Sequence, residues 1–336
     1  MTKSTFWKIV FPIIIAVVVV VGATVACLFL FGVVGGKEDN LDAPKNRKLS
    51  NSEINELYEI LEIVDEQGEL EGFSIVGLKQ YPEKDVTLPN TYKVDGKDIP
   101  FIAVAPSVFA NSQTLEDLTI PSNYKTIGAS AFANCQALTS VFVEENSALE
   151  TIAAYAFSGC LALHSFTFDQ NSVLESIGAY AFSSAGFLNI NTFKFEIDLG
   201  FNVSLKRIDE GAFQGAMLTQ FTVPSSVTYI GDLAFSGCMY LERFNFERSE
   251  NWHELQIVNN NKDSAHLFNS ANTFYSKGSF YLLNTKAENV ATALNVLKNG
   301  MAVNFVRNYK MYVDKNANVD NIDYGFEAII TSLPVD

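Results

Sequence analysis

The residues best suited to chemistry in this sequence are its cysteines. Cys135, Cys160 and Cys238 hold the same place in a recurring segment, whereas Cys27 lies in an apolar stretch. A thiolate can act as a nucleophile or bind zinc, but it then needs a base or further ligands nearby. No two cysteines have the C-x-x-C spacing typical of zinc or redox sites. We therefore expect three buried thiols that pack between repeats, with a disulfide or a catalytic thiol as the alternative.

The histidines do not form a recognisable catalytic or metal-binding pattern. His164 lies at a junction between repeats, and His253 and His266 have no cysteine or paired carboxylate at ligand spacing. Hydrolase, P-loop, dinucleotide-binding, zinc-protease and EF-hand motifs are missing from the sequence. We therefore expect a protein that binds without catalysis and that needs no metal or cofactor.

The charge of the chain restricts its partners. The formal net charge is −15, and 48% of the residues are hydrophobic whereas only 18% are charged. A strongly acidic surface repels nucleic acid, so we exclude DNA and RNA as partners. The apolar content is typical of a folded protein with a sizeable core.

An uncharged apolar segment at residues 9–36 predicts a membrane anchor. Its length of about 28 residues exceeds the roughly 20 that cross a bilayer, and also the roughly 7 to 15 of a signal peptide. Cys27 resembles the lipidated cysteine of a lipoprotein, but the residues after it stay apolar, so a plain membrane cysteine is the main interpretation.

We expect a single-pass protein of the cell membrane, with a short tail at residues 1–8 and residues 37–336 outside the cell. Basic residues flank both ends of the apolar segment, so charge by itself does not decide the orientation. A tail of about eight residues is too short for a signalling domain. The function therefore lies in the part that follows the anchor.

A repeated segment dominates the rest of the chain. Its copies begin at Ile127, Ile152, Ile177, Ile208 and Ile230, and each has Ala-Phe four and five residues later. The phenylalanines fall at positions 109, 132, 157, 182, 213 and 235, which gives spacings of 22 to 31 residues. Periods of about 20 to 29 residues are typical of leucine-rich repeats.

Short alternating segments follow the repeated leucines and predict β-strands. They lie at residues 141–143, 166–168, 221–223 and 244–246, and the outer two residues of each share one face. One repeat cannot bury its apolar residues alone, but stacked repeats share a continuous core. We predict an α/β repeat fold, a leucine-rich-repeat solenoid with parallel strands on one face, preceded by one transmembrane helix.

The consensus I-G-x-x-A-F-x-x-C-x-x-L-x-x-[VF]-x-[VF]-P closely resembles the BspA-like class of leucine-rich repeats. The resemblance covers about residues 73–246 and recurs five or six times. It implies a microbial surface or secreted protein that adheres to host proteins or to other cells. The third repeat lacks its cysteine at Ala185, and a longer insertion runs over residues 189–204, where we expect the regular strand to be interrupted.

The flanks of the repeats predict further segments. Residues 37–49 are polar and indicate a linker, and residues 50–72 indicate a helical cap or stalk, with a helix over 50–67 that begins in a Ser50 and Glu53 capping box. The repeats then occupy residues 73–248.

The C-terminal part predicts degenerate repeats and a cap at residues 249–313, followed by a tail at 314–336. Strand, helix and strand are expected at residues 279–283, 286–298 and 301–306, with Thr285 and Glu288 as the capping box. Residues 266–268 suggest one more degenerate repeat.

The outward positions of the strands are the candidate binding site. They are Ser140, Phe142, Ser165, Thr167, Gln220, Thr222, Arg243 and Asn245. Phe142 and Arg243 are of types enriched in interfaces, although a merely solvated sheet face is the alternative. We predict a protein or glycan ligand, on a host or neighbouring cell, for adhesion or colonisation. The competing prediction is a self-associating scaffold of the cell envelope.

Overall fold

The structure is a computed structural model that describes residues 48–169, 171–188, 195–199, 201–202, 204–258, 279–300, 310–318 and 328–331. These residues all belong to one unit, Ala43–Asp336. The expected anchor at residues 9–36 and the tail at 1–8 lie outside the described residues. Among the helices that are described, none is long and apolar enough to cross a membrane.

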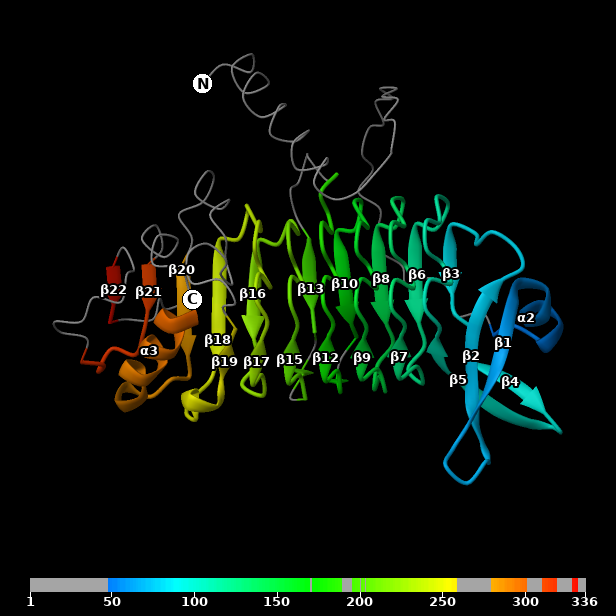
Figure 1. Cartoon of the computed structure of the whole chain (residues 1–336), viewed down its shortest axis with the longest axis horizontal. Helices are drawn as coiled ribbons and strands as arrows, with labels where there is room; N and C mark the ends of the chain where they lie inside the picture. Colours follow the sequence, from blue (N-terminus) through cyan, green and yellow to red (C-terminus); the bar gives the residue numbers. More distant parts are fainter. Residues whose placement is uncertain are drawn as a thin grey trace, which may run out of the picture. The chain divides into compact units, whose positions relative to one another are not determined.

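The coils of the repeat region contribute long strands to one side and two-residue strands to another, and each kind pairs in parallel from coil to coil (Figure 1). The first ladder contains β3 (Asp85–Thr87), β6 (Asp117–Ile120), β8 (Ser140–Val143), β10 (Ser165–Phe168) and β13 (Glu196–Asp198). The second contains the two-residue strands β7 (Thr126–Ile127), β9 (Thr151–Ile152), β12 (Ser176–Ile177), β15 (Arg207–Ile208), β17 (Tyr229–Ile230) and β19 (Gln256–Ile257). The predicted solenoid of leucine-rich-repeat type with parallel strands is confirmed.

The repeated phenylalanines form a continuous stack through the core. Neighbouring rings from Phe109 to Phe235 lie 4.8 to 5.4 Å apart between centroids, with 3° to 15° between ring planes. All six rings are buried. The isoleucine of each two-residue strand is also buried, except Ile257 at the last one. Within each strand, alternate side chains point into the core. Stacking of the coils then removes these apolar side chains from water.

The insertion at residues 189–204 divides the ladder of long strands, but the regular strand expected to be interrupted there still forms, as β13, and the break follows it. The first ladder ends at β13, and a separate ladder contains β16 (Gln220–Val223), β18 (Arg243–Glu247), β20 (Ser279–Leu283), β21 (Lys310–Tyr312) and β22 (Ala328–Ile330). Among the described residues, an isolated bridge from Phe195 to Leu218 lies between these two ladders, and the ladder of two-residue strands continues past the break through β12, β15 and β17. The insertion also holds β14 (Phe201–Asn202), which pairs with β11 (Asn171–Ser172).

The N-terminal flank is less helical than predicted. Helix α2 (Asn51–Leu57) does begin in the Ser50 and Glu53 capping box, but the chain then forms β1 (Tyr58–Val64) instead of continuing the helix to residue 67. β1 pairs antiparallel with β2 (Leu70–Leu78), which joins the solenoid through β5 (Lys97–Val104). β5 also pairs with β4 (Thr91–Val94). The β-branched residues of β1 favour a strand once β2 offers its edge.

The C-terminal flank follows the predicted strand, helix and strand order with shifted bounds. β20 is followed by the 3₁₀ helix η3 (Ala287–Asn289) and helix α3 (Val290–Gly300). The next described strand in this ladder is β21, whereas the strand expected at residues 301–306 lies outside the described residues. β22 pairs with β21, so the expected tail at 314–336 contributes a strand.

The predicted capping box of the C-terminal helix is wrong. Thr285 does not cap the helix, because its Oγ1 donates to the carbonyl of Arg248 at 2.6 Å, and the cap residue Lys286 makes no side-chain capping bond. The Thr285 hydroxyl therefore bonds to the carbonyl of a residue far away in the sequence instead of capping the helix that follows it. The extra repeat expected at residues 266–268 lies outside the described residues. β18 pairs directly with β20. A 3₁₀ turn, η1 (Trp252–Glu254), precedes β19.

Candidate binding face

The outward side chains of the long strands form two rows that cross from coil to coil. Strand register aligns one row of Asp85, Asp117, Ser140, Ser165 and Glu196, which continues after the interruption as Gln220, Arg243, Ser279 and Lys310. The other row contains Thr87, Thr119, Phe142, Thr167 and Asp198, then Thr222, Asn245, Tyr281 and Tyr312. We call these two rows the strand face. All eight predicted residues lie on it, in two groups.

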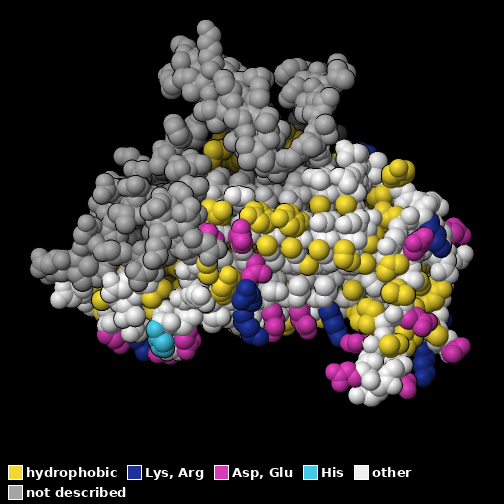
Figure 2. Space-filling model, in the orientation of Figure 1, with side chains coloured by type: hydrophobic (Ala, Val, Ile, Leu, Met, Phe, Trp, Pro, Cys, Tyr) yellow, Lys and Arg dark blue, Asp and Glu magenta, His cyan; other side chains and the backbone are white. Residues whose placement is uncertain are grey.

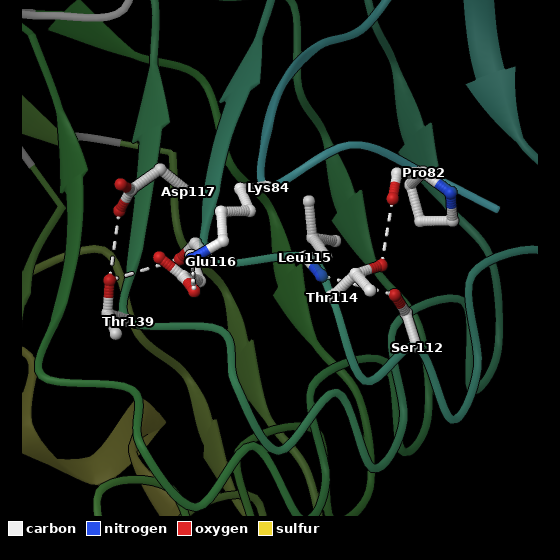
Figure 3. Close-up of polar contacts among 8 residues, drawn as sticks. All are labelled: Pro82, Lys84, Ser112, Thr114, Leu115, Glu116, Asp117 and Thr139. Carbon is white, nitrogen blue, oxygen red and sulfur yellow. Dashed lines mark hydrogen bonds and ion pairs between the residues drawn. The ribbon is translucent and has the colours of Figure 1, made fainter.

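The N-terminal end of the strand face is acidic, and the chain itself uses its polar groups. Lys84 Nζ lies 2.6 Å from Glu116 Oε1, and Thr139 Oγ1 donates to Asp117 Oδ1 at 2.9 Å (Figure 3). Ser140 Oγ also donates to Asp117 Oδ1. The two hydroxyl groups hold the Asp117 carboxylate in place, and Lys84 pairs with the Glu116 carboxylate. These contacts leave this end with fewer groups for a ligand than its composition suggests.

The part of the strand face on β8 and β10 is half-buried and uncharged, and Glu196 and Asp198 follow it on β13. Phe142, Ser165 and Thr167 have intermediate exposure, and the residues beside them in the strands point into the core. Phe142 lies between Thr119 and Thr167 in register. Its ring is the aromatic feature of this part of the face.

The C-terminal end of the strand face is a linked group of polar and aromatic side chains. Asn245 Nδ2 donates to Thr222 Oγ1 at 2.9 Å, and Arg243 Nε donates to Asn245 Oδ1 at 3.2 Å. The guanidinium carbon of Arg243 lies 4.6 Å from the ring centroid of Tyr281. The Tyr281 ring stacks on Tyr312, with 4.8 Å between centroids and 10° between planes. We call these five residues the Arg243 cluster.

Sequence reasoning missed two aromatic members of the Arg243 cluster. Tyr281 lies in a segment that was predicted to be a strand, and its position between buried Phe280 and Leu282 indicates that it points outward. Tyr312 had no such signal, because its strand was expected at residues 301–306. Asn245 was identified, but its side chain is only 7% exposed, so it supports Arg243 more than it offers contacts.

Charge varies along the strand face. Asp85 and Asp117 lie in the first two strands of one row, whereas Arg243 and exposed Lys310 lie in the same row at the other end. In the orientation of Figure 1, rows of hydrophobic side chains run from coil to coil above a line of charged side chains (Figure 2). The chain has a net charge of −15, so the two cations Arg243 and Lys310 distinguish the C-terminal end of the strand face electrostatically from the acidic N-terminal end.

The cysteines have a structural position. Cys135, Cys160 and Cys238 are buried and form no disulfide, as predicted. Each thiol donates to a phenylalanine carbonyl in the preceding coil, at 3.1 to 3.2 Å from sulfur to oxygen. Burial raises the pKa of the Cys135 thiol to about 12 and that of Cys160 well above its ordinary value. A nucleophile would need a thiolate at neutral pH, so these groups are poorly suited to catalysis.

The described histidines do not belong to a cluster that could hold a metal ion. Within the described residues, no three His, Cys, Asp or Glu side chains lie close enough to hold a metal ion. His164 and His253 belong to this part of the chain, whereas His266 lies outside it.

Comparison with solved structures finds several matching proteins. A leucine-rich-repeat protein of Treponema pallidum is 23% identical, covering 59% of this chain and 71% of its own, with a TM-score of 0.40. A leucine-rich cell surface protein of Faecalibacterium prausnitzii is 21% identical, covering 73% and 66%, with a TM-score of 0.41. The pneumococcal vaccine antigen PcpA is 14% identical, covering 83% and 98%, with a TM-score of 0.35.

Family membership follows from the sequence itself. Comparison with curated proteins found no match. The profile of the BspA type leucine-rich-repeat region matches residues 102–242 and 194–301, in six copies. These ranges include more than half of the chain and all the coils of the phenylalanine stack except the start of the first. The chain therefore belongs to the BspA-type leucine-rich-repeat family.

Proposed function

We propose that this protein is a cell-surface binding protein that holds a protein or glycan partner on the Arg243 cluster. The observation that carries the proposal is the continuous contact from Thr222 through Asn245 and Arg243 to the stacked Tyr281 and Tyr312. Binding is the whole activity in this proposal, and no chemical step is involved.

The residue types of the Arg243 cluster suit recognition. Arginine and tyrosine are enriched among the residues that contribute most to binding energy, and a guanidinium is a planar donor of several hydrogen bonds. Here Asn245 and Tyr281 already orient the guanidinium. Binding of a partner would therefore cost less side-chain entropy at Arg243 than at a mobile arginine.

Display at the cell surface rests on the N-terminal segment. Residues 9–36 are uncharged and long enough to span a bilayer, which supports a single-pass anchor with residues 37–336 outside. The proposed role is adhesion or colonisation, through a partner on a host or neighbouring cell.

The second candidate function is self-association as an envelope scaffold. It is supported by β1, which pairs with β2 alone among the described strands and exposes Leu61 and Val64 by 60% and 53%. An exposed apolar edge strand can pair with another chain. A mass that rises with protein concentration, without added partner, would favour this function.

The first experiment tests display. An epitope is placed at the C-terminus, and intact cells are probed with an antibody and an external protease. Accessibility on intact cells is expected. An epitope that is reached only after permeabilisation would overturn surface display and favour a tethered scaffold on the inner side.

The second experiment tests the Arg243 cluster. Adhesion of cells that express Arg243→Ala or Tyr281→Ala is compared with wild type, and both are expected to adhere several-fold less. Tyr81→Ala is the matched control, because Tyr81 is 91% exposed and lies outside the strand face. Equal adhesion by all variants at equal surface levels would overturn the assignment.

A further inference from the structure

A second aromatic surface lies at the turns that follow the two-residue strands. The third residue after each buried Ile or Val has a left-handed backbone, with φ between 56° and 62°; these residues are Ser107, Ser130, Tyr155, Tyr180, Gly211 and Leu233. Left-handed backbone is rare for a bulky residue such as tyrosine. Coil-to-coil hydrogen bonds maintain it, because the N–H groups of Tyr155 and Tyr180 donate to the carbonyls of Ala179 and Glu210, both at 2.9 Å.

We call these six aligned turn residues the turn column. Its two tyrosines, Tyr155 and Tyr180, stack on each other. Their ring centroids are 5.2 Å apart, and the ring planes differ by 10°. On the far side of Tyr180 the column has Gly211, where an added Cβ would lie 2.4 Å from the Tyr180 ring. The Tyr180 hydroxyl donates to Glu210 Oε1 at 2.9 Å. Tyr180 is therefore enclosed on both faces and fixed at its end.

The other face of Tyr155 is open. Tyr180 covers one face, and the opposite face points to the preceding coil, where the column has only Ser130 and then Ser107. Tyr155 is 46% exposed. The stack of rings thus ends at Tyr155. In the preceding coil, the residue at the same turn position is Ser130, whose side chain is too small to cover the ring.

The chain itself indicates what fits on such a ring. The guanidinium of Arg207 lies 3.9 Å from the centroid of Tyr229 and also contacts Asp209 at 2.7 Å, and Arg243 lies over Tyr281. In both cases an arginine covers a tyrosine face, which is a favourable contact between a cation and the ring quadrupole. The net charge of −15 further favours a cationic occupant.

We propose that the open face of Tyr155, above Ser130, binds an arginine side chain of a basic segment in a partner protein. The carboxylate of Glu210, at the other end of the tyrosine pair, adds to the attraction of the cation. This surface is separate from the Arg243 cluster, where the strand face itself supplies the cations.

The titration of Tyr180 agrees with a negative environment at these rings. Burial, the hydrogen bond to Glu210 and the charges of Glu210 and Asp232 together raise the pKa of Tyr180 to about 12. The same negative charges that oppose a tyrosinate favour an external cation.

The test uses the full-length chain, in a mild detergent because residues 9–36 are apolar, and a fluorescein-labelled peptide of nine arginines. Anisotropy at about 0.15 M salt is expected to show tighter binding than a nine-lysine peptide, because the guanidinium stacks on rings and the ammonium does so less well. Tyr155→Ala is expected to weaken binding at least about threefold, and Tyr155→Phe to retain it.

Two further variants separate the site from folding and from net charge. Ser130→Leu fills the place beside Tyr155 while leaving the ring, and leucine is already accommodated in this column at Leu233, so binding should fall as in Tyr155→Ala. Glu210→Gln should weaken binding more than Glu150→Gln, which removes an equal charge at another exposed position.

Three results would overturn the proposal. One is an equal effect of Tyr155→Ala and Tyr81→Ala, and another is unchanged binding by Ser130→Leu. The third is equal binding of the two peptides by all variants, which would indicate attraction by net charge alone. Capture of a neutral oligosaccharide by wild type but not by Tyr155→Ala, without arginine binding, would instead assign the ring to glycans.

Discussion

Phe157 and Phe182 lie face to face in the core, with 5.4 Å between ring centroids and 7° between ring planes. The next pair, Phe182 and Phe213, has the same 5.4 Å separation, although it is 31 residues apart in sequence and not 25. The longer repeat therefore does not disturb the stack. The effect of the longer repeat appears in the strand ladder, which ends at β13 and begins again at β16.

The first prediction concerns this stack. Phe182→Ala should lower the free energy of unfolding by about 3 to 5 kcal/mol, because it removes a buried ring that contacts neighbours in two coils. Phe142→Ala, at a half-buried position of the strand face, should cost less than about 1.5 kcal/mol. Urea unfolding followed by circular dichroism measures both. Equal losses would contradict a special role for the stack.

The second prediction concerns Gly211. Gly211→Ala should destabilise the protein more than Gly215→Ala, by about 1 kcal/mol or more. Both glycines have positive φ, so the backbone cost of alanine is similar. Only at Gly211 would the new Cβ meet the Tyr180 ring, at 2.4 Å, whereas at Gly215 the nearest atom is 3.6 Å away. Thermal unfolding compares the two, and similar melting temperatures would show that the ring moves aside freely.

The third prediction concerns pH. The pKa of the buried Cys135 thiol rises from 9.0 to about 12, so above pH 9 the unfolded chain loses this proton while the folded chain keeps it. Stability from the thiol is thus fully present below pH 9 and falls as pH rises towards 12. The stability advantage of wild type over Cys135→Ala should shrink by about 2 kcal/mol between pH 8 and pH 10.5.

The Cys135→Ala variant is a suitable reference because alanine already occupies the same repeat position at Ala185 and Ala216. Urea unfolding at the two pH values gives the difference, in which other titrating groups cancel. A constant difference would mean that the thiol ionises equally in both states.

The fourth prediction concerns the attachment of the chain after residue 248 to the preceding coils. Arg248 is 5% exposed and donates to the carbonyls of Val227 and Asn251, and its own carbonyl accepts from Thr285. Arg248→Met should cost about 2 to 4 kcal/mol, because buried carbonyls lose a charged donor. Thr285→Val should cost about 1 kcal/mol and leave the arginine in place.

Limited proteolysis locates the effect of these two changes. Arg248→Met should expose the chain after residue 248 to cleavage sooner than it exposes the earlier coils. Since a solenoid is stabilised by contacts between neighbouring repeats, its end can loosen by itself. Uniform cleavage along the whole chain would contradict this local role.

The sequence by itself determined the coil. The repeated Ile, Ala, Phe and Leu positions identify the core, and alternation in each strand shows which side chains face outward. Arg243 and Thr222 were identified on this basis, and both lie on the strand face. Such predictions succeed because the inward or outward direction of a strand residue depends on a local period of two.

Only the tertiary structure decided which residues meet across coils. The insertion before Leu205 ends one ladder and begins another, the edge of β2 makes β1 a strand, and Thr285 prefers the carbonyl of Arg248 to its own helix. Tyr281 and Tyr312 stack because β20 and β21 pair in register. These relationships depend on pairing between distant segments, which is set by how coils stack and is not contained in any local spacing.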